Sequence, residues 1–227
     1  MPSYLQNQPT GSKIVDPRFQ LTGKGGAVPD TLQPAELGFV LDRSSSMRGL
    51  VNEAVGGFNT LVDEQRTVTP PANFSASLFN YDVKLLYDAV PLSQVPSLTM
   101  SMYEPYGGTA LNEGIGFMIQ AVGKRAKRST RVLIAILTDG AENSSRKFSQ
   151  DDVLRMITYR RSTYDWQFVF IGPADALPYA LSIGIPKSNV VAFNADPAGI
   201  RQIMQRLSKS MAAYQLGDRR YALKLHN

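Results

Sequence analysis

Short apolar runs alternate with amphipathic segments along most of this chain, and this alternation restricts the possible folds more than any other feature. An apolar run at 36–42 is followed by a segment at 47–64 whose apolar residues recur at helical spacing. The runs at 132–138 and 166–171 are followed by helical segments in the same way. Alternating strands and helices build a mostly parallel sheet with helices on both faces. We therefore predict an α/β fold with an open, doubly wound sheet.

Two consecutive β segments, near 73–79 and 82–89, interrupt this alternation. The polar turn Asn80–Asp82 between them is typical of a hairpin. One antiparallel edge strand is therefore expected on the otherwise parallel sheet. The remaining predicted elements are a helix after Thr109, a helix at 149–159 with a capping box, a short helix at 175–181, a strand at 189–193 and a last helix that Asp196 caps.

The composition changes along the chain and divides it into three parts. Residues 1–34 are rich in Gly, Pro, Gln and Thr without a period, which indicates an extended or disordered arm. Residues 35–212 carry the alternating elements, and residues 213–227 form a basic C-terminal tail. Apolar residues make up 43% of the whole chain, which is enough for one sizeable core.

The composition also excludes several kinds of chemistry. The 227 residues contain no cysteine, so disulfides, thiolate metal sites and thiol nucleophiles are ruled out. The single histidine is His226, which leaves a Ser-His-Asp triad without a plausible base. No segment has the apolar core of a signal peptide or the roughly 20 apolar residues of a membrane span. We expect a non-enzymatic, cytoplasmic protein without a membrane partner.

Polar residues gather where the predicted strands end. Asp42, Ser44 and Ser46 follow the first strand in a D-x-S-x-S spacing, Thr109 follows paired glycines, and Asp139 follows the most apolar strand. Sheets of this kind bind ligands at the carboxyl ends of their strands. Carboxylates and hydroxyls are hard oxygen donors, which suit Mg²⁺. We predict a metal site made of these five residues, for Mg²⁺ or alternatively Mn²⁺ or Ca²⁺.

Taken one at a time, the same residues have purely structural explanations. Ser44 and Ser46 are good helix caps. Asp139 before Gly140 is typical of a turn, and Thr109 beside two glycines can cap the next helix. Their order along the chain and their positions at strand ends favour the joint interpretation as a metal site.

In these residues the chain resembles the von Willebrand factor A domain family and its metal-ion-dependent adhesion site. Three motifs match the family's pattern in chain order: Asp42, Ser44 and Ser46, then Thr109, then Asp139. The resemblance covers residues 36 to about 210. It implies that the hydroxyls contact the cation, that the aspartates act directly or through water, and that a carboxylate of a protein partner completes the coordination.

The net charge of +5 favours acidic partners without identifying them. Of three basic clusters, the first follows a predicted helix, the second lies on another helix and the third lies in the tail; they comprise Lys124, Arg125, Lys127, Arg128 and Arg131, then Arg155, Arg160 and Arg161, then Arg219, Arg220 and Lys224. Solvated helix ends explain the first cluster, and nucleic-acid binding is an alternative although no recognised motif supports it. Self-association through the arm and tail is a further alternative.

Two groups of residues near the predicted site have less definite roles. Tyr103, Tyr106 and Phe148 lie in loops that should border the site, where they would form an apolar rim around a partner's side chain or pack within the loops. Glu113 and Glu142 flank the site, and we expect them to be solvated at the surface.

Overall fold

A computed structural model describes residues 35–218 of the chain and contains a six-stranded sheet with the strand order β3-β2-β1-β4-β5-β6. Strand β3 pairs antiparallel with β2, and all other pairs are parallel. The strands are β1 (Ala35–Asp42), β2 (Ala72–Phe79), β3 (Val83–Pro91), β4 (Val132–Leu137), β5 (Gln167–Gly172) and β6 (Val190–Ala192). The predicted doubly wound sheet with one antiparallel edge strand is confirmed.

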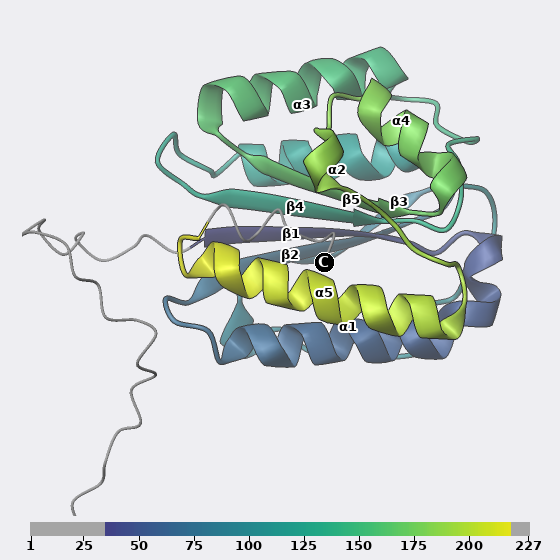
Figure 1. The fold of residues 1–227 in the computed structure, drawn as a ribbon, viewed down its shortest axis with the longest axis horizontal. Coiled ribbons are helices and arrows are strands. Elements are labelled where there is room, and N and C mark those ends of the chain that lie inside the picture. The colour runs from purple at the N-terminus through teal and green to yellow at the C-terminus, as the bar shows by residue number, and fades with distance from the viewer. Residues whose placement is uncertain (1–34, 219–227) are drawn as a thin grey trace, which may run out of the picture. The chain divides into compact units, whose positions relative to one another are not determined.

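Helices cover both faces of this sheet (Figure 1). They are α1 (Val51–Arg66), α2 (Leu111–Gly123), α3 (Gln150–Tyr164), α4 (Leu177–Ser182) and α5 (Pro197–Gln215). Helices α1 and α5 pack on one face, and α2, α3 and α4 on the other. Successive side chains of a strand point to opposite faces, so Phe39 joins the first core and Val40 the second. This double burial explains why β1 and β4 are apolar without alternation.

The helix starts follow the predicted caps. The Ser149 side chain accepts a hydrogen bond from the Asp152 backbone N–H, and the Asp152 carboxylate accepts one from the Ser149 backbone N–H, which completes the capping box. The Asp196 carboxylate accepts a 2.7 Å hydrogen bond from the Gly199 N–H, and Pro197 occupies the first turn of α5. Within residues 35–218 no helix is long and apolar enough to cross a membrane.

Two boundaries differ from the prediction. The segment at 47–64 is not one helix, because a 3₁₀ helix, η2 (Ser45–Leu50), precedes α1. Helix α5 continues to Gln215, past the predicted start of the tail at 213. Tyr214 and Gln215 are fully buried, and the Tyr214 hydroxyl donates a hydrogen bond of 2.9 Å to the Val132 carbonyl. The predicted arm (1–34) and the rest of the tail (219–227) lie outside the described residues, so self-association through them stays a prediction.

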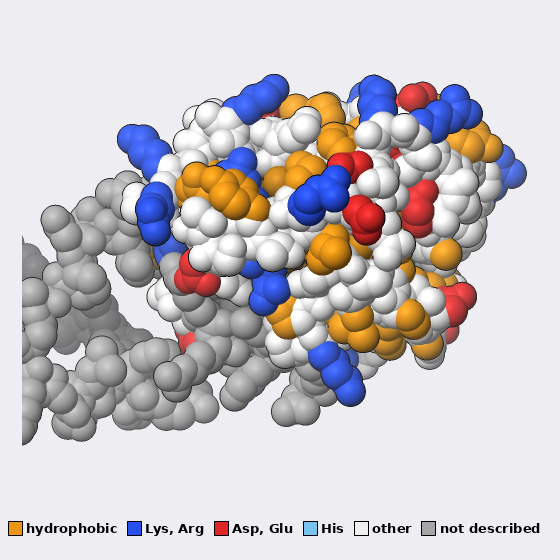
Figure 2. Space-filling model, turned by 90° about the horizontal axis from the view of Figure 1, so that it is seen from above, with side chains coloured by type: hydrophobic (Ala, Val, Ile, Leu, Met, Phe, Trp, Pro, Cys, Tyr) orange, Lys and Arg blue, Asp and Glu red, His pale blue; other side chains and the backbone are white. Residues whose placement is uncertain are grey.

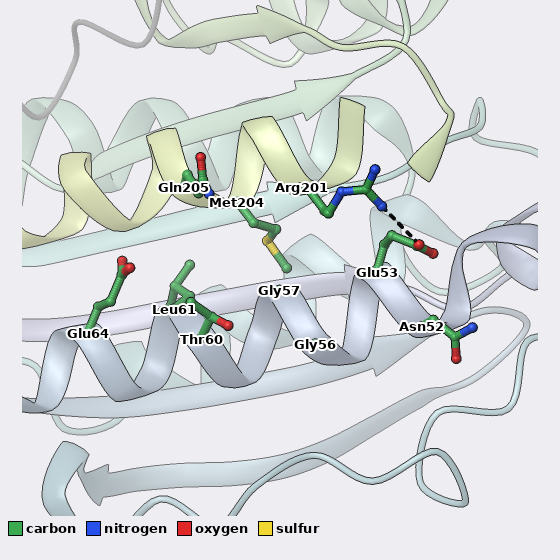
Figure 3. A pocket seen from close by; sticks show the side chains of 10 residues that line it. All are labelled: Asn52, Glu53, Gly56, Gly57, Thr60, Leu61, Glu64, Arg201, Met204 and Gln205. Atoms are coloured by element: carbon green, nitrogen blue, oxygen red, sulfur yellow. Dashed lines mark hydrogen bonds and ion pairs between the residues drawn. The ribbon is translucent and has the colours of Figure 1, made fainter. Parts of the chain in front are cut away.

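Helices α1 and α5 lie side by side with a groove between them (Figure 3). In the groove, Met204 of α5 lies against Gly57 of α1, so closely that a Cβ atom at position 57 would be 2.8 Å from Met204 Cγ. An ion pair of 3.1 Å joins Glu53 to Arg201 across the same groove. Glycine at position 57 therefore sets how closely the two helices approach.

Candidate metal site

The predicted site residues lie where the central strands end. Asp42 is the last residue of β1, and Leu41 is in register with Leu137 at the end of β4. Thr138, the residue after β4, is therefore beside Asp42, and its hydroxyl donates a hydrogen bond of 2.5 Å to Asp42 Oδ2. The parallel register thus brings the two strand ends together from positions 96 residues apart.

Backbone hydrogen bonds join the loops that carry the other residues. The Ser45 N–H donates to the Gly107 carbonyl at 3.0 Å, which ties the first serine loop to the loop before α2. The Thr109 N–H donates to Asn143 Oδ1 at 2.9 Å, and the Asn143 N–H donates to the Thr109 carbonyl at 3.0 Å. The loop after β4 therefore holds Thr109 in place from the other side.

One continuous set of hydrogen bonds joins the two serines and the two aspartates. Ser46 Oγ donates to Asp139 Oδ1 at 2.6 Å and lies 3.0 Å from Ser44 Oγ. The Ser44 N–H in turn donates to Asp42 Oδ1 at 2.6 Å. The structure thus brings together four of the predicted ligands, which come from two separate loops.

Thr109, the fifth predicted ligand, borders the same space. A Cβ atom at Gly140 would lie 3.4 Å from Thr109 Oγ1 and 3.9 Å from Ser46 Oγ. A side chain at position 140 would therefore fill the space between these two hydroxyls. Glycine there keeps the space between the donors open, which a cation needs.

The paired glycines before Thr109 allow close packing. Gly107 has a φ of 77°, a left-handed conformation that side chains rarely adopt. A Cβ atom at Gly107 would be 2.5 Å from Tyr81 Cδ2, and one at Gly108 would be 2.8 Å from Tyr81 Cε1. The Tyr81 ring thus lies directly on the glycine pair, and larger residues would push Thr109 out of position.

Burial shifts both carboxylic acids towards the neutral form. Burial raises the pKa of Asp42 to about 6, although hydrogen bonds from Thr138 and Ser44 oppose this effect and the nearby Asp139 adds to it. Burial also raises the pKa of Asp139, against the hydrogen bond from Ser46. A cation between the two groups would offset both effects, because it stabilises the charged carboxylates.

The donor set fits a hard cation. It consists of two carboxylates and three hydroxyls, and no group of three or more His, Cys, Asp or Glu side chains that suits a metal occurs between residues 35 and 218. Asp42, Ser44 and Thr109 are buried, whereas Ser46 is exposed and Asp139 is half-exposed. The set therefore opens to solvent on the side of Ser46 and Asp139.

Sequence reasoning missed two residues that hold Asp42. Thr138 is fully buried, and its hydroxyl also accepts a hydrogen bond of 3.1 Å from the Gly140 N–H. Tyr103, which was expected in an exposed rim or in loop packing, is 1% exposed, and its hydroxyl donates to the Asp42 carbonyl at 2.6 Å. The rim interpretation is wrong for Tyr103. The position of Thr138 immediately before Asp139 was the available signal for its role.

The two glutamates near the site were expected to be solvated surface residues. In the structure both instead accept hydrogen bonds from nearby backbone N–H groups. Glu113 is 8% exposed, and its Oε1 accepts hydrogen bonds from the Arg146 and Lys147 N–H groups. Glu142 accepts from the backbone N–H groups of Asn112 at 2.9 Å and of Ser144 at 2.9 Å. Both carboxylates therefore order the loop between β4 and α3.

The first basic cluster follows α2, which ends at Gly123, as predicted. Two of its arginines are not simply solvated. Arg125 forms ion pairs with Glu36 at 3.1 Å and Asp88 at 2.6 Å. Arg131 is 8% exposed and donates to the Tyr214 carbonyl at 2.7 Å. Both arginines thus have structural roles.

Comparisons with known proteins bear on the fold. No protein-family model and no curated protein sequence matches the chain. Among solved structures, a von Willebrand factor type A protein from Catenulispora acidiphila matches with a TM-score of 0.61 and 17% identity over 81% of this chain and 43% of that one. Proximal thread matrix protein 1 from the mussel byssus, with zinc in its MIDAS motif, matches with a TM-score of 0.56 and 13% identity over 79% and 48%.

A third match is the manganese-loaded TRAP protein of Plasmodium vivax, with a TM-score of 0.52 and 16% identity over 74% of this chain and 72% of that one. The chain spans less than half the length of the first two structures. At these identities the similarity concerns the fold. The chain has the fold of the von Willebrand factor A domains.

Proposed function

We propose that this chain is a non-enzymatic, cytoplasmic protein-binding module that depends on a divalent cation, with Mg²⁺ as the preferred ion. Asp42, Ser44, Ser46, Thr109 and Asp139 would hold the ion. The observation that supports the proposal is the convergence of these five oxygen-bearing side chains at the carboxyl end of the sheet. Similar folds with zinc or manganese bound add support.

The proposed partner is a protein that presents a carboxylate. Bound Mg²⁺ would supply a positive charge and an exchangeable coordination position, because this ion usually keeps several water ligands. Cationic side chains of the same region favour an acidic partner. Arg48 is exposed and donates to the Pro105 carbonyl at 3.3 Å, and the Arg43 guanidinium lies 5.2 Å from the centre of the half-exposed Tyr106 ring.

The first test compares neighbouring serines. Ser46→Ala removes a hydroxyl that bonds to Asp139, so we expect Mg²⁺ affinity to fall at least tenfold in titration calorimetry. Ser45→Ala is the matched control, because the backbone N–H of Ser45, and not its hydroxyl, joins the loops. Equal affinities for the two variants would contradict the assignment of the site.

The second test addresses the partner. The immobilised full chain is used to capture proteins in Mg²⁺ and in excess chelator, with Asp139→Ala as the metal-site variant. We expect a partner that is released by chelator and is not retained by Asp139→Ala. Substituting the partner's contacting Asp or Glu by the amide should then abolish capture. Binding that persists in chelator would contradict the metal-dependent mechanism.

A further inference from the structure

Two basic clusters that are separate in the sequence lie together in the structure. Arg160, near the end of α3, extends to the end of α2, where its guanidinium occupies the space that a side chain at Gly123 would need. The Arg160 guanidinium also lies 5.8 Å from the centre of the Tyr159 ring. The cationic residues that follow Gly123 therefore lie at the same end of the two helices as the tyrosines. We define the basic–aromatic surface by the residues at this end: Lys124, Lys127, Arg128, Tyr159, Arg160 and Tyr164.

The aromatic part of this surface is held in place by an arginine. The Tyr159 and Tyr164 rings meet edge to face with centroids 5.6 Å apart. The Arg160 guanidinium lies 5.1 Å from the centre of the Tyr164 ring and 4.7 Å from that of the buried Trp166 ring. Tyr159 nevertheless stays 53% exposed. An exposed ring held in one orientation can stack on a planar group at a small cost in entropy.

The cationic residues of the surface form no ion pairs within the described part of the chain. Lys124, Lys127 and Arg128 are exposed and have no acidic partner among residues 35–218. The dipole of α2, which ends at Gly123, favours cations only within about its last turn, so it accounts for Lys124 but not for the two that follow. The exposed Asp165 at the end of α3 reduces the local positive charge without removing it.

The surface lies at the opposite end of the sheet from the candidate metal site. Strand carboxyl ends carry the metal site, whereas α2 and α3 run back and end beside the strand amino ends (Figure 1). Seen from the side of α3, blue side chains stand around orange ones towards the end where that helix finishes (Figure 2). A ligand at this end would leave the metal site accessible.

We propose that the basic–aromatic surface binds single-stranded nucleic acid. Phosphates of the strand would pair with Lys124, Lys127 and Arg128, and an unstacked base would stack on Tyr159. Proteins that bind single strands without sequence preference combine these two elements, cationic tracks and aromatic platforms. A purely electrostatic partner would not require the exposed ring, and the stacked bases of a duplex could not use it.

The test uses the full chain and a fluorescently labelled 20-nucleotide dT strand, with anisotropy measured at low salt in chelator. Tyr159→Ala is expected to weaken binding about tenfold, since stacking on one aromatic side chain is worth about 1–3 kcal/mol per base. Tyr159→Phe keeps the ring and should bind like the unaltered chain. Circular dichroism on each variant establishes that it is folded.

The charges are tested by a matched pair of double variants. Lys127→Ala with Arg128→Ala should weaken binding about tenfold and reduce the slope of log affinity against log salt by about 1.4, since each phosphate contact on a single strand contributes about 0.7. Lys84→Ala with Lys209→Ala removes the same charge from exposed positions on β3 and α5 and should have little effect. Equal losses in both pairs would overturn the proposal in favour of general attraction by net charge.

Other outcomes would also overturn it. These are an absence of binding at low salt, equal binding of a duplex with no response to Tyr159→Ala, and equally tight binding of polyglutamate, which would indicate an acidic protein partner instead. Asp139→Ala should bind the dT strand normally. Failure of the proposed nucleic-acid binding is therefore distinguishable from failure of the proposed metal-dependent function.

Discussion

At the scale of single residues, the candidate site depends on neighbours that are not ligands themselves. Thr138 and the Ser44 N–H each bond one oxygen of the Asp42 carboxylate, so both oxygens are held before any cation binds. Mutation of residues that orient ligands in this way typically lowers metal affinity about 10–100-fold. The site is therefore a property of its loops as well as of its five-residue motif.

Glu113 provides a residue-scale prediction about pH. Burial alone would raise the pKa of Glu113, but hydrogen bonds from Ser145 and from the Arg146 and Lys147 N–H groups outweigh it and lower the pKa. Glu113→Gln should cost about 1 kcal/mol of unfolding free energy at pH 7, because hydrogen bonds to a charged acceptor are stronger than those to a neutral one.

The sign of the pH dependence follows from the lowered pKa. The stabilisation by ionised Glu113 is present above the unfolded pKa of about 4.3 and is lost as pH falls through the lower folded value. Urea unfolding of both proteins from pH 7 to pH 3 should therefore show a difference that shrinks in acid. A constant difference would mean that the charge of Glu113 is not involved.

At the scale of elements, the contact between α1 and α5 depends on one of two adjacent glycines. Gly57→Ala would place a Cβ 2.8 Å from Met204 Cγ and 3.2 Å from Met204 Cβ, atoms near the helix backbone that cannot move away easily. We expect a loss of about 1–3 kcal/mol, as for overpacked cores. Chemical denaturation of Gly57→Ala and of the unaltered protein measures this loss of unfolding free energy.

Gly56→Ala is the control, because a Cβ at position 56 would meet nothing within 4 Å. Alanine there should stabilise the protein by up to about 1 kcal/mol, since it raises helix propensity at an exposed position. Equal effects of the two substitutions would show that contact with α5 does not determine the spacing of the helices.

At the scale of the whole molecule, metal binding should increase the free energy of unfolding. A ligand that binds only the folded state adds about 1.4 kcal/mol when its free concentration is ten times Kd. For a chain of this length that raises the melting temperature by about 3–6 °C. Mg²⁺ should produce this rise in the unaltered protein and not in Asp139→Ala. An identical rise in both would place the stabilising ion elsewhere.

The sequence alone was sufficient for the layered architecture and for the five candidate ligands. A continuous apolar run indicates a strand that is buried on both faces of a sheet, and apolar residues at helical spacing indicate a helix with one buried face. The order of the elements therefore follows from local patterns in the sequence. The candidate ligands were recognisable because Asp42 and Asp139 follow such runs directly and because the five residues match a family motif in chain order. Local spacing therefore carries both kinds of information.

Only the tertiary structure decided which polar residues serve the fold and which remain available. Tyr103 and Glu113 resemble surface residues in the sequence, yet each forms hydrogen bonds with backbone groups of a distant segment. Gly123 and Arg160 are separate in the sequence, and packing of α3 beside α2 brings the Arg160 guanidinium against Gly123. Such pairings depend on long-range contacts, which leave no periodic signal in the chain, and so they become visible only when the packed molecule is seen.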